Sequence, residues 1–225
     1  MDEQKELSYR QRWGLLAAIQ QALLRRLHMW LGLCVYGIYT RPLESTKHPD
    51  AAMPGFSYRL FVQGEADELI SCARHPELDL PPQFVRDALE KGDVCHAVLH
   101  DGEIVSYSWA AFTPTHDVDG VYIEFGEKYR YGYKLLTLPQ YRGHHLPRIF
   151  KPFRDRYCVD IRGRTHSIVF VAVSNHSSTT TLIAQGNCRI GFAGYVKRGA
   201  IFRAFRTPGV RRLGFNFFVP DNKTR

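Results

Sequence analysis

The chain has 225 residues, of which 44% are apolar and 13% are aromatic. This composition can fill the core of one domain of ordinary size with an appendage, and it excludes a disordered tail. Lysine and arginine outnumber aspartate and glutamate by 30 to 22, which gives a formal net charge of +8. The excess favours an acidic partner: a phosphate-bearing small molecule, an anionic lipid or nucleic acid.

The cysteines, the histidines and the N-terminus restrict the class further. Five cysteines are widely spaced without a C-x-x-C pair, which predicts reduced thiols rather than a disulfide framework or a zinc site. Ten histidines show no paired metal-ligand spacing, so no metal is expected. The opening MDEQKELSYRQRW is too polar for a secretory signal, and the longest apolar run, 29–39, is too short to span a bilayer. We therefore expect a cytoplasmic protein.

A helix is predicted near the N-terminus, from about Trp13 to Val35. Apolar residues recur there at spacings of three and four, which draws one stripe along a helix. The stripe consists of Leu16, Ile19, Leu23, Leu27, Trp30, Leu31 and Cys34. It packs on the main domain or on a second copy in a homodimer. Alternatively, because arginines flank the tryptophans, it makes peripheral contact with a membrane surface.

Prolines and a glycine interrupt the sequence TRPLESTKHPDAAMPG, which follows this stripe. Residues that break helices and strands at this density predict a linker. We therefore divide the chain into an N-terminal amphipathic helical extension (1–41), a linker (42–55) and a main domain (56–225).

The main domain alternates between strand and helix patterns. The strands are expected at 56–62, on both sides of Asp101-Gly102 in the hairpin 94–112, and at 120–125, 131–138, 167–173, 189–198 and 213–219. The helices are expected at 65–75, 81–92, from about His145 to Val159, and at 177–185. This order predicts an α/β (α+β) fold: a mixed, mostly antiparallel sheet with helices on both faces, plus the N-terminal helix.

The stretch LTLPQYRGHHLPRIF, 136–150, changes from strand to helix at a turn that carries an arginine and a glycine. The first turn of a helix leaves backbone N–H groups without intrahelical partners, and these groups attract anions. Gly143 allows a ligand to approach the backbone, and Arg142 adds a full positive charge. The stretch is therefore either an ordinary turn or a cradle for phosphate.

The surroundings of this turn resemble the GNAT superfamily of N-acyltransferases. P-x-Y-R-G follows a strand here, and the apolar strand IVFVAVSN comes one helix later. In that superfamily an R/Q-x-x-G-x-G/A segment wraps the pyrophosphate of coenzyme A; Arg142 and Gly143 take its first two places. His145 and Pro147 stand where the motif has a glycine and a small residue. The family's N-x-x-S/A pattern matches Asn175 and Ser178, and Gly-Asn replaces its Gly-Phe.

The resemblance implies acetyl-CoA or another acyl-CoA as co-substrate, and a set of residues that bind it. The end of the strand would pair with the pantetheine and polarise the thioester carbonyl, chiefly through backbone groups of Leu136 and Leu138. The whole implied set is Leu136, Thr137, Leu138, Arg142, Gly143, His144, His145, Leu146, Asn175 and Ser178.

The catalytic groups follow the family pattern less closely. The family's base is often a carboxylate on the strand before the turn; the nearest acid in this sequence is Glu124, on a neighbouring strand. The family's thiolate acid is a tyrosine seven residues after the asparagine, where this chain has Leu182, so Tyr195 or water would replace it. We expect Glu124 as base and Tyr195 as acid.

These features predict an N-acyltransferase that moves an acyl group, by expectation acetyl, from coenzyme A to the amine of a small molecule. Two alternatives stay open. One is transfer from acyl carrier protein at a membrane surface, and the other is a non-catalytic binding module whose cradle is altered by His145 and Pro147. The basic stretch 197–212 suits nucleic acid or a solvated sheet edge. We favour the sheet edge and do not expect nucleic acid as a partner.

Overall fold

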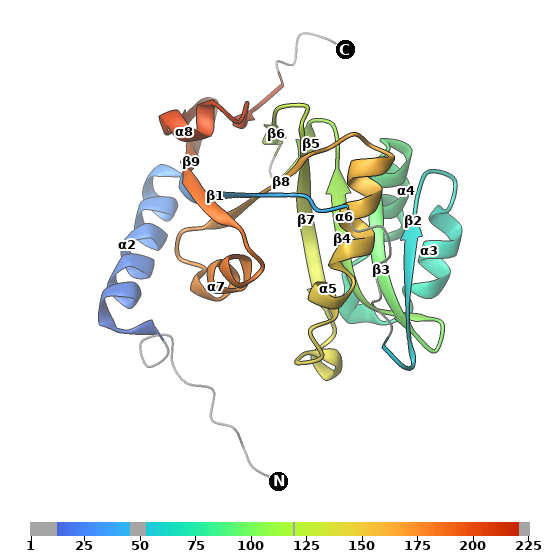
Figure 1. Cartoon of the computed structure of the whole chain (residues 1–225). Helices are drawn as coiled ribbons and strands as arrows, with labels where there is room; N and C mark the ends of the chain where they lie inside the picture. Colours follow the sequence, from blue (N-terminus) through green and yellow to red (C-terminus); the bar gives the residue numbers. More distant parts are fainter. Residues whose placement is uncertain (1–12, 46–52, 119, 221–225) are drawn as a thin grey trace. The chain divides into compact units, whose positions relative to one another are not determined.

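A computed structural model of the chain (Figure 1) describes residues 13–45, 53–118 and 120–220. The chain divides into two compact units, which we describe separately. The central unit comprises residues 40–115 and 125–169. The terminal unit comprises residues 1–39, 116–124 and 170–225. The boundaries fall within the strands β1 (Leu33–Pro42) and β8 (His166–Ala172), between the two residues of β5 (Thr115–His116), and after the last residue of β6 (Tyr122–Glu124). The middle of the predicted linker, 46–52, lies outside the described residues.

The sheet of the central unit is mixed and mostly antiparallel. Its strands are β2 (Phe56–Phe61), β3 (Val94–His100), β4 (Glu103–Ala111), β7 (Tyr129–Thr137) and β8 (His166–Ala172). Neighbouring strands pair antiparallel from β2 through β3 and β4 to β7, whereas β8 pairs parallel to β7. The hairpin between β3 and β4 turns at Asp101 and Gly102, both with positive φ (50° and 80°), as the favoured two-residue turn requires.

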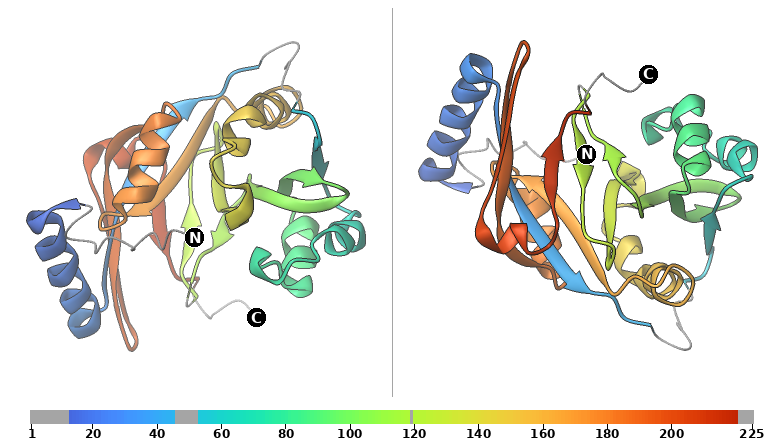
Figure 2. Two further views of the ribbon diagram at one scale, coloured as in Figure 1. Left: turned by 90° about the horizontal axis from the view of Figure 1, so that it is seen from below. Right: turned by 90° about the horizontal axis from the view of Figure 1, so that it is seen from above.

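Helices cover both faces of this sheet, as Figure 2 shows. They are α3 (Ala66–Cys72), the short η1 (Pro76–Leu78) and α4 (Pro82–Glu90), then η2 (Pro139–Tyr141), α5 (Leu146–Ile149) and α6 (Lys151–Asp160). Trp109 packs edge-on against Phe84 of α4, and Tyr58 stacks on Phe153 of α6. Because side chains alternate between the faces of a sheet, these two contacts mark opposite faces. The predicted fold class is confirmed.

The helix predicted from His145 to Val159 is broken into α5 and α6. The break falls at Phe150, whose φ and ψ are −90° and 4°. Pro152 causes it, because proline has no N–H to donate and its ring collides with the carbonyl of the residue four positions earlier. Only a four-residue helix therefore follows the predicted cradle. Its dipole contributes less positive potential to the cradle than the longer predicted helix would.

The described part of the terminal unit contains a second group of strands and three helices. Its strands are β1 (Leu33–Pro42, as far as Tyr39), β6 (Tyr122–Glu124), β9 (Cys188–Arg198), β10 (Ile201–Arg206) and β11 (Asn216–Phe218); β5 (Thr115–His116) begins at its boundary. Its helices are α2 (Leu15–Leu31), α7 (His176–Ala184) and α8 (Pro208–Arg211). β10 pairs antiparallel with β9 and ends the strand order. The basic stretch 197–212 therefore supplies an edge strand, as favoured from the sequence.

The N-terminal helix is shorter than predicted. It ends at Leu31, where Gly32 adopts a left-handed conformation (φ 67°) and donates its N–H to the carbonyl of His28 at 2.8 Å. The residues that follow form β1, so Cys34 and Val35 belong to a strand and not to the helical stripe.

Helix α2 has no buried residue, and Leu16 and Trp30 are 84% and 74% exposed. No helix in the described part of the chain combines the length and apolar content needed to cross a membrane. The limits of the extension, the linker and the main domain stay a prediction. All of β1 except its last residue, Pro42, lies inside the segment 1–41.

Candidate active site

Strand β7 of the central unit changes direction at a β-bulge before it reaches the predicted cradle. The register with β4 shifts between Tyr107 and Trp109, opposite Lys134, and Lys134 itself has a positive φ of 47°. A bulge inserts an extra residue and bends the strand that carries it. The described ladder between β7 and β8 joins only Tyr129–Tyr131 to His166–Ile168. Beyond that ladder the last residues of β7 have no described pairing to β8, so one edge of the strand is left unpaired among the described residues.

The backbone of β7 shows which groups face that unpaired edge. The N–H of Leu138 donates to the carbonyl of Val105 at 2.9 Å, and the carbonyl of Leu136 accepts from Ser106 Oγ at 3.1 Å. Both residues therefore direct their backbone groups toward β4 and are already engaged there. Because backbone groups alternate along a strand, Leu135 and Thr137 direct theirs to the opposite edge. A ligand at the unpaired edge would therefore meet the backbone groups of Leu135 and Thr137, not those of Leu136 and Leu138.

The turn from Arg142 to Leu146 carries four successive backbone N–H groups without an acceptor among the described residues. They belong to Gly143, His144, His145 and Leu146, and the first three of these residues are exposed. Gly143 has φ 86°, and a Cβ built on it would meet nothing within 4 Å. Alternating backbone conformations that present consecutive N–H groups to one side form a concave anion site. The turn is therefore open above the glycine and able to receive an anion.

The side chains of the turn leave its backbone accessible. The Nε–H of Arg142 donates to the carbonyl of Thr137 at 3.2 Å, which holds this guanidinium beside the end of β7. The ring of His144 lies against Phe56, with 6.1 Å between the ring centroids. His145 precedes α5 with φ 55°, the left-handed conformation that glycine adopts most easily. The sequence departs from the family motif at His145, yet the backbone keeps a glycine-like shape there.

Asn175 and Ser178 belong to the terminal unit and form the N-terminal cap of α7. The Asn175 side-chain oxygen accepts a hydrogen bond from the Ser178 N–H at 3.0 Å. This is the usual capping contact of an asparagine that precedes a helix. The predicted site is thus divided: 136–146 lie together in the central unit, and Asn175 and Ser178 lie together in the terminal unit.

The expected catalytic residues Glu124 and Tyr195 also lie in the terminal unit. Glu124 ends β6, is half-buried, and accepts a hydrogen bond from Asn216 Nδ2 at 3.1 Å. Tyr195 is buried on β9, 6.3 Å from Tyr36 between ring centroids. Burial raises the pKa of Tyr195; the hydrogen bond with Tyr36 lowers it in part, and the neighbouring Cys34 raises it. The phenol therefore stays protonated at neutral pH.

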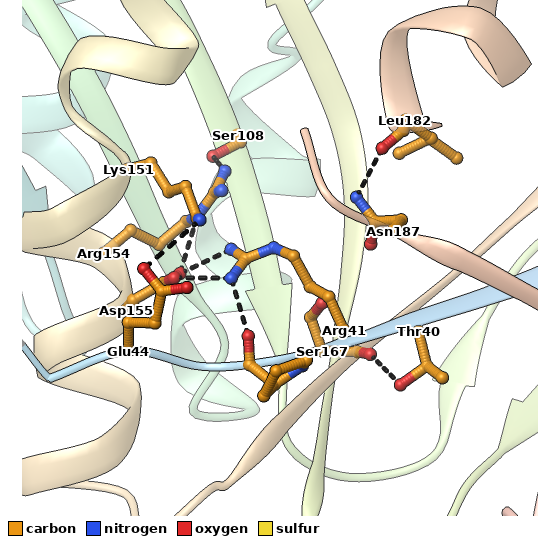
Figure 3. Close-up of polar contacts among 11 residues, drawn as sticks. Thr40, Arg41, Glu44, Ser108, Lys151, Arg154, Asp155, Ser167, Leu182 and Asn187 are labelled. Atoms are coloured by element: carbon orange, nitrogen blue, oxygen red, sulfur yellow. Dashed lines mark hydrogen bonds and ion pairs between the residues drawn. The ribbon is translucent and has the colours of Figure 1, made fainter. Parts of the chain in front are cut away.

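A buried group of charges in the central unit was missed by sequence reasoning. We call it the arginine layer; it consists of Arg41, Arg130, Arg154 and Asp155. Arg41 binds both carboxylate oxygens of Asp155, at 2.6 and 2.7 Å, and Arg154 lies beside the pair, as Figure 3 shows. Burial opposes the charge of Asp155, but the hydrogen bonds from Arg41 and the nearby arginines outweigh it and lower the pKa. These residues are far apart in the sequence, so no local sequence motif predicts that they cluster.

A pocket in the terminal unit was also not predicted. It has a volume of about 480 Å³ and lies between α2, β1, α7 and β9. Its apolar lining includes Leu23 and Leu24 of α2, Val35 and Phe192, and its polar lining includes Arg189. The predicted N-terminal helix therefore forms one wall of a pocket, which its apolar stripe alone does not reveal.

Comparison with known proteins gave matches among solved structures alone. No protein-family model and no curated protein matches the sequence. A tandem GNAT protein from the clavulanic acid biosynthesis pathway is 16% identical, with 81% of this chain and 57% of that chain covered and a TM-score of 0.48. A GNAT-family acetyltransferase from Novosphingobium aromaticivorans is 15% identical, covering 71% of this chain and 61% of that chain, with a TM-score of 0.46.

A third similar structure is the aminoglycoside N-acetyltransferase AAC(6')-Iy in complex with CoA. It is 14% identical, with 68% of this chain and 98% of that chain covered and a TM-score of 0.46. This chain spans 56% to 61% of the length of the first three solved structures that it matches. At these identities and TM-scores the similarity does not by itself assign a function to this chain.

Proposed function

We propose that this chain is a GNAT-type acyltransferase that transfers an acyl group, in the first instance acetyl, from coenzyme A to the amine of a small molecule. The observation that carries the proposal is the run of four successive backbone N–H groups from Gly143 to Leu146 that have no acceptor among the described residues, with Arg142 beside it. A diphosphate presents several negatively charged oxygens, and such a run of donors is suited to receive them.

The end of β7 supports the same proposal. Beyond Tyr131 the strand has no described pairing to β8, and Leu135 and Thr137 direct backbone groups to that edge. An extended pantetheine arm carries amide groups, so it can add to an unpaired strand edge through main-chain hydrogen bonds. A free N–H on this edge would also polarise the thioester carbonyl, where charge develops during transfer.

Acyl transfer to an amine needs few further groups. A base must remove a proton from the ammonium, and we assign this role to Glu124, whose neighbour Asn216 holds its carboxylate in one orientation. An acid must protonate the departing thiolate, and we assign this role to Tyr195. A longer acyl chain, or acyl carrier protein as the donor, stays a prediction.

The proposal predicts that binding and chemistry can be separated by two substitutions. Gly143→Asp places a carboxylate where the phosphates would lie, so calorimetry should show acetyl-CoA binding reduced at least about 100-fold, because like charges and lost backbone access both oppose binding. Glu124→Gln keeps the shape of the side chain and removes its basicity. It should bind acetyl-CoA like the wild type and lose about 100- to 10,000-fold in thiol release with a panel of small amines.

Gly163→Asp is the matched control for the glycine. Gly163 also has a positive φ, 63°, is exposed, and has nothing within 4 Å of a built Cβ. Both aspartates should therefore lower the melting temperature by a similar small amount, while only Gly143→Asp affects acetyl-CoA. Equal affinities in the two variants would remove the turn from the proposal. Unchanged turnover in Glu124→Gln would remove this residue as base and leave the turn in place.

A further inference from the structure

The arginine layer contains more positive charge than its one carboxylate can balance. Both oxygens of Asp155 already bind Arg41. Arg154 approaches Asp155 only to 3.8 Å through Nε, and within the described residues no ion pair reaches Arg130. Arg130 is 3% exposed. Buried charges normally have a partner of opposite sign, because the loss of hydration is otherwise too costly.

Hydrogen bonding compensates these cations only in part. The Nε atoms of Arg130 and Arg154 are buried and have no hydrogen-bond partner in the described part of the chain. Burial, and then the charge of Arg154, lower the pKa of Arg130 to about 10, so it remains charged at neutral pH. Two guanidinium charges are thus left beneath α6 without a carboxylate of their own.

His96 adds a buried donor next to these charges. Burial, and then the charges of Arg154 and Arg130, hold the pKa of His96 well below its usual value, so the imidazole is neutral. Its Nδ1 lies 2.6 Å from the hydroxyl of Tyr58. Burial raises the pKa of Tyr58, so the phenol keeps its proton and donates to Nδ1. The remaining N–H of His96 is then on Nε2, which is buried without a partner among the described residues.

A small cavity adjoins the same side chains. It measures about 20 Å³, enough for a single guest the size of a water molecule. Its polar lining consists of Tyr58, His96, Ser106, Tyr107, Ser108 and Arg154. Arg154 Nη1 contacts Ser108 Oγ at 3.3 Å in this lining. No carboxylate is among the lining residues, and two of them, His96 and Arg154, carry a buried ring or guanidinium nitrogen without a partner among the described residues. The space is too small for phosphate.

We propose that this cavity binds a small monovalent anion of the size of chloride. The anion would accept hydrogen bonds from His96 Nε2 and from the side chains of Arg154 and Ser108, and its charge would offset part of the excess in the arginine layer. A water molecule fits the space but supplies no charge. The site lies beneath α5 and α6 and is independent of the turn at Gly143.

The test compares chloride with gluconate, which is too large for the cavity, at constant ionic strength. The melting temperature of the full chain should rise with chloride in a saturable way, by about 3–6 °C at ten times the dissociation constant. Arg154→Gln removes the main ligand and should abolish this rise. Because it also removes an unbalanced buried charge, it should not lower the melting temperature in gluconate.

Arg156→Gln is the matched control on the same helix. Arg156 is exposed and pairs with Asp160 at 3.3 Å, so its variant should keep the full chloride response. Equal melting temperatures of the wild type in chloride and gluconate would overturn the proposal, as would an equal chloride response in the two variants. If Arg154→Gln does not fold, wild-type crystals grown in bromide decide the question: an anomalous peak beside Arg154 supports the site, and its absence there contradicts it.

Discussion

His145 adopts a backbone conformation that costs free energy for any residue with a Cβ. Its φ of 55° is in the left-handed region, where such residues lose about 1–2 kcal/mol. The residue is exposed and its carbonyl accepts from the N–H groups of Arg148 and Ile149. The strain is therefore maintained by the start of α5, in the same turn that presents the free N–H groups. Strain of this kind concentrates at binding sites.

Replacing His145 with glycine should relieve this strain. The gain is partly offset by the greater freedom of glycine in the unfolded chain, so we expect a melting temperature equal to that of the wild type or up to about 3 °C higher. Removal of the Cβ also widens access to the backbone, so acetyl-CoA affinity should increase in calorimetry. His144→Gly is the control, because His144 does not have a positive φ. A lower affinity in His145→Gly would show that the imidazole itself binds the ligand.

The N-terminal segment contains two elements that contribute differently to the core, the helix α2 and the strand β1. α2 buries no residue, whereas β1 buries Ile38, Tyr39 and Arg41. The boundary between the two is sharp: the carbonyl of Gly32 accepts from the N–H of Lys197 at 3.1 Å, and a Cβ on Gly32 would collide with the Lys197 backbone. Gly32 is therefore the last position before the chain joins β9.

Shortening the chain should give two distinct results. A chain that begins at Gly32 lacks only α2 and the residues before it, and it should still unfold cooperatively on heating. A chain that begins at Leu43 also lacks β1 and the Arg41 partner of Asp155, and it should show no cooperative transition, because one partner of a buried ion pair is left alone. Circular dichroism during heating measures both. Loss of cooperativity in the longer chain would make α2 part of the core.

Elements with a clear periodic spacing of apolar residues or a local turn signal could be predicted from the sequence. Features that depend on contacts between distant parts of the chain could not. The hairpin at Asp101-Gly102 and the alternating strands were found because their signals are local. β1 was missed because its apolar run continued the helical stripe, and only the conformation of Gly32 separates the two. The arginine layer was missed because Arg41 and Asp155 are 114 residues apart. Within the candidate site, the turn at Gly143 was predicted. The residues of β7 whose backbone groups face the unpaired edge were not, because the bulge at Lys134 shifts the alternation of these groups along the strand.

The stability of the whole molecule should depend on pH through Asp155. Its pKa is lower in the folded chain than the value of about 3.9 expected when unfolded. A group with a lowered pKa stabilises the folded state fully above its unfolded pKa. That stabilisation is lost as the pH falls from about 4 through the folded value. The melting temperature of the wild type should therefore fall steeply below about pH 4.

Asp155→Asn tests whether this carboxylate is responsible. At neutral pH it should cost about 3–5 kcal/mol, because three buried guanidinium groups lose their one carboxylate. Its melting temperature should also fall less steeply with acid than that of the wild type. The control is Asp160→Asn, which removes an exposed partner of Arg156 and should change stability by less than about 1 kcal/mol. A similar acid profile in all three proteins would assign the pH dependence to other groups.

Part of the chain's positive charge lies on the edge strand β10, where it opposes self-association. Its outer side has no neighbouring strand in the described order, and Ile201 and Phe205 are 62% and 41% exposed. An open edge of this kind can pair with the same edge of another chain and begin aggregation. Arg203 and Arg206 occupy this strand, so two copies that approach edge to edge bring like charges together. The arginines that made nucleic acid a candidate partner thus help to keep the protein from associating with itself.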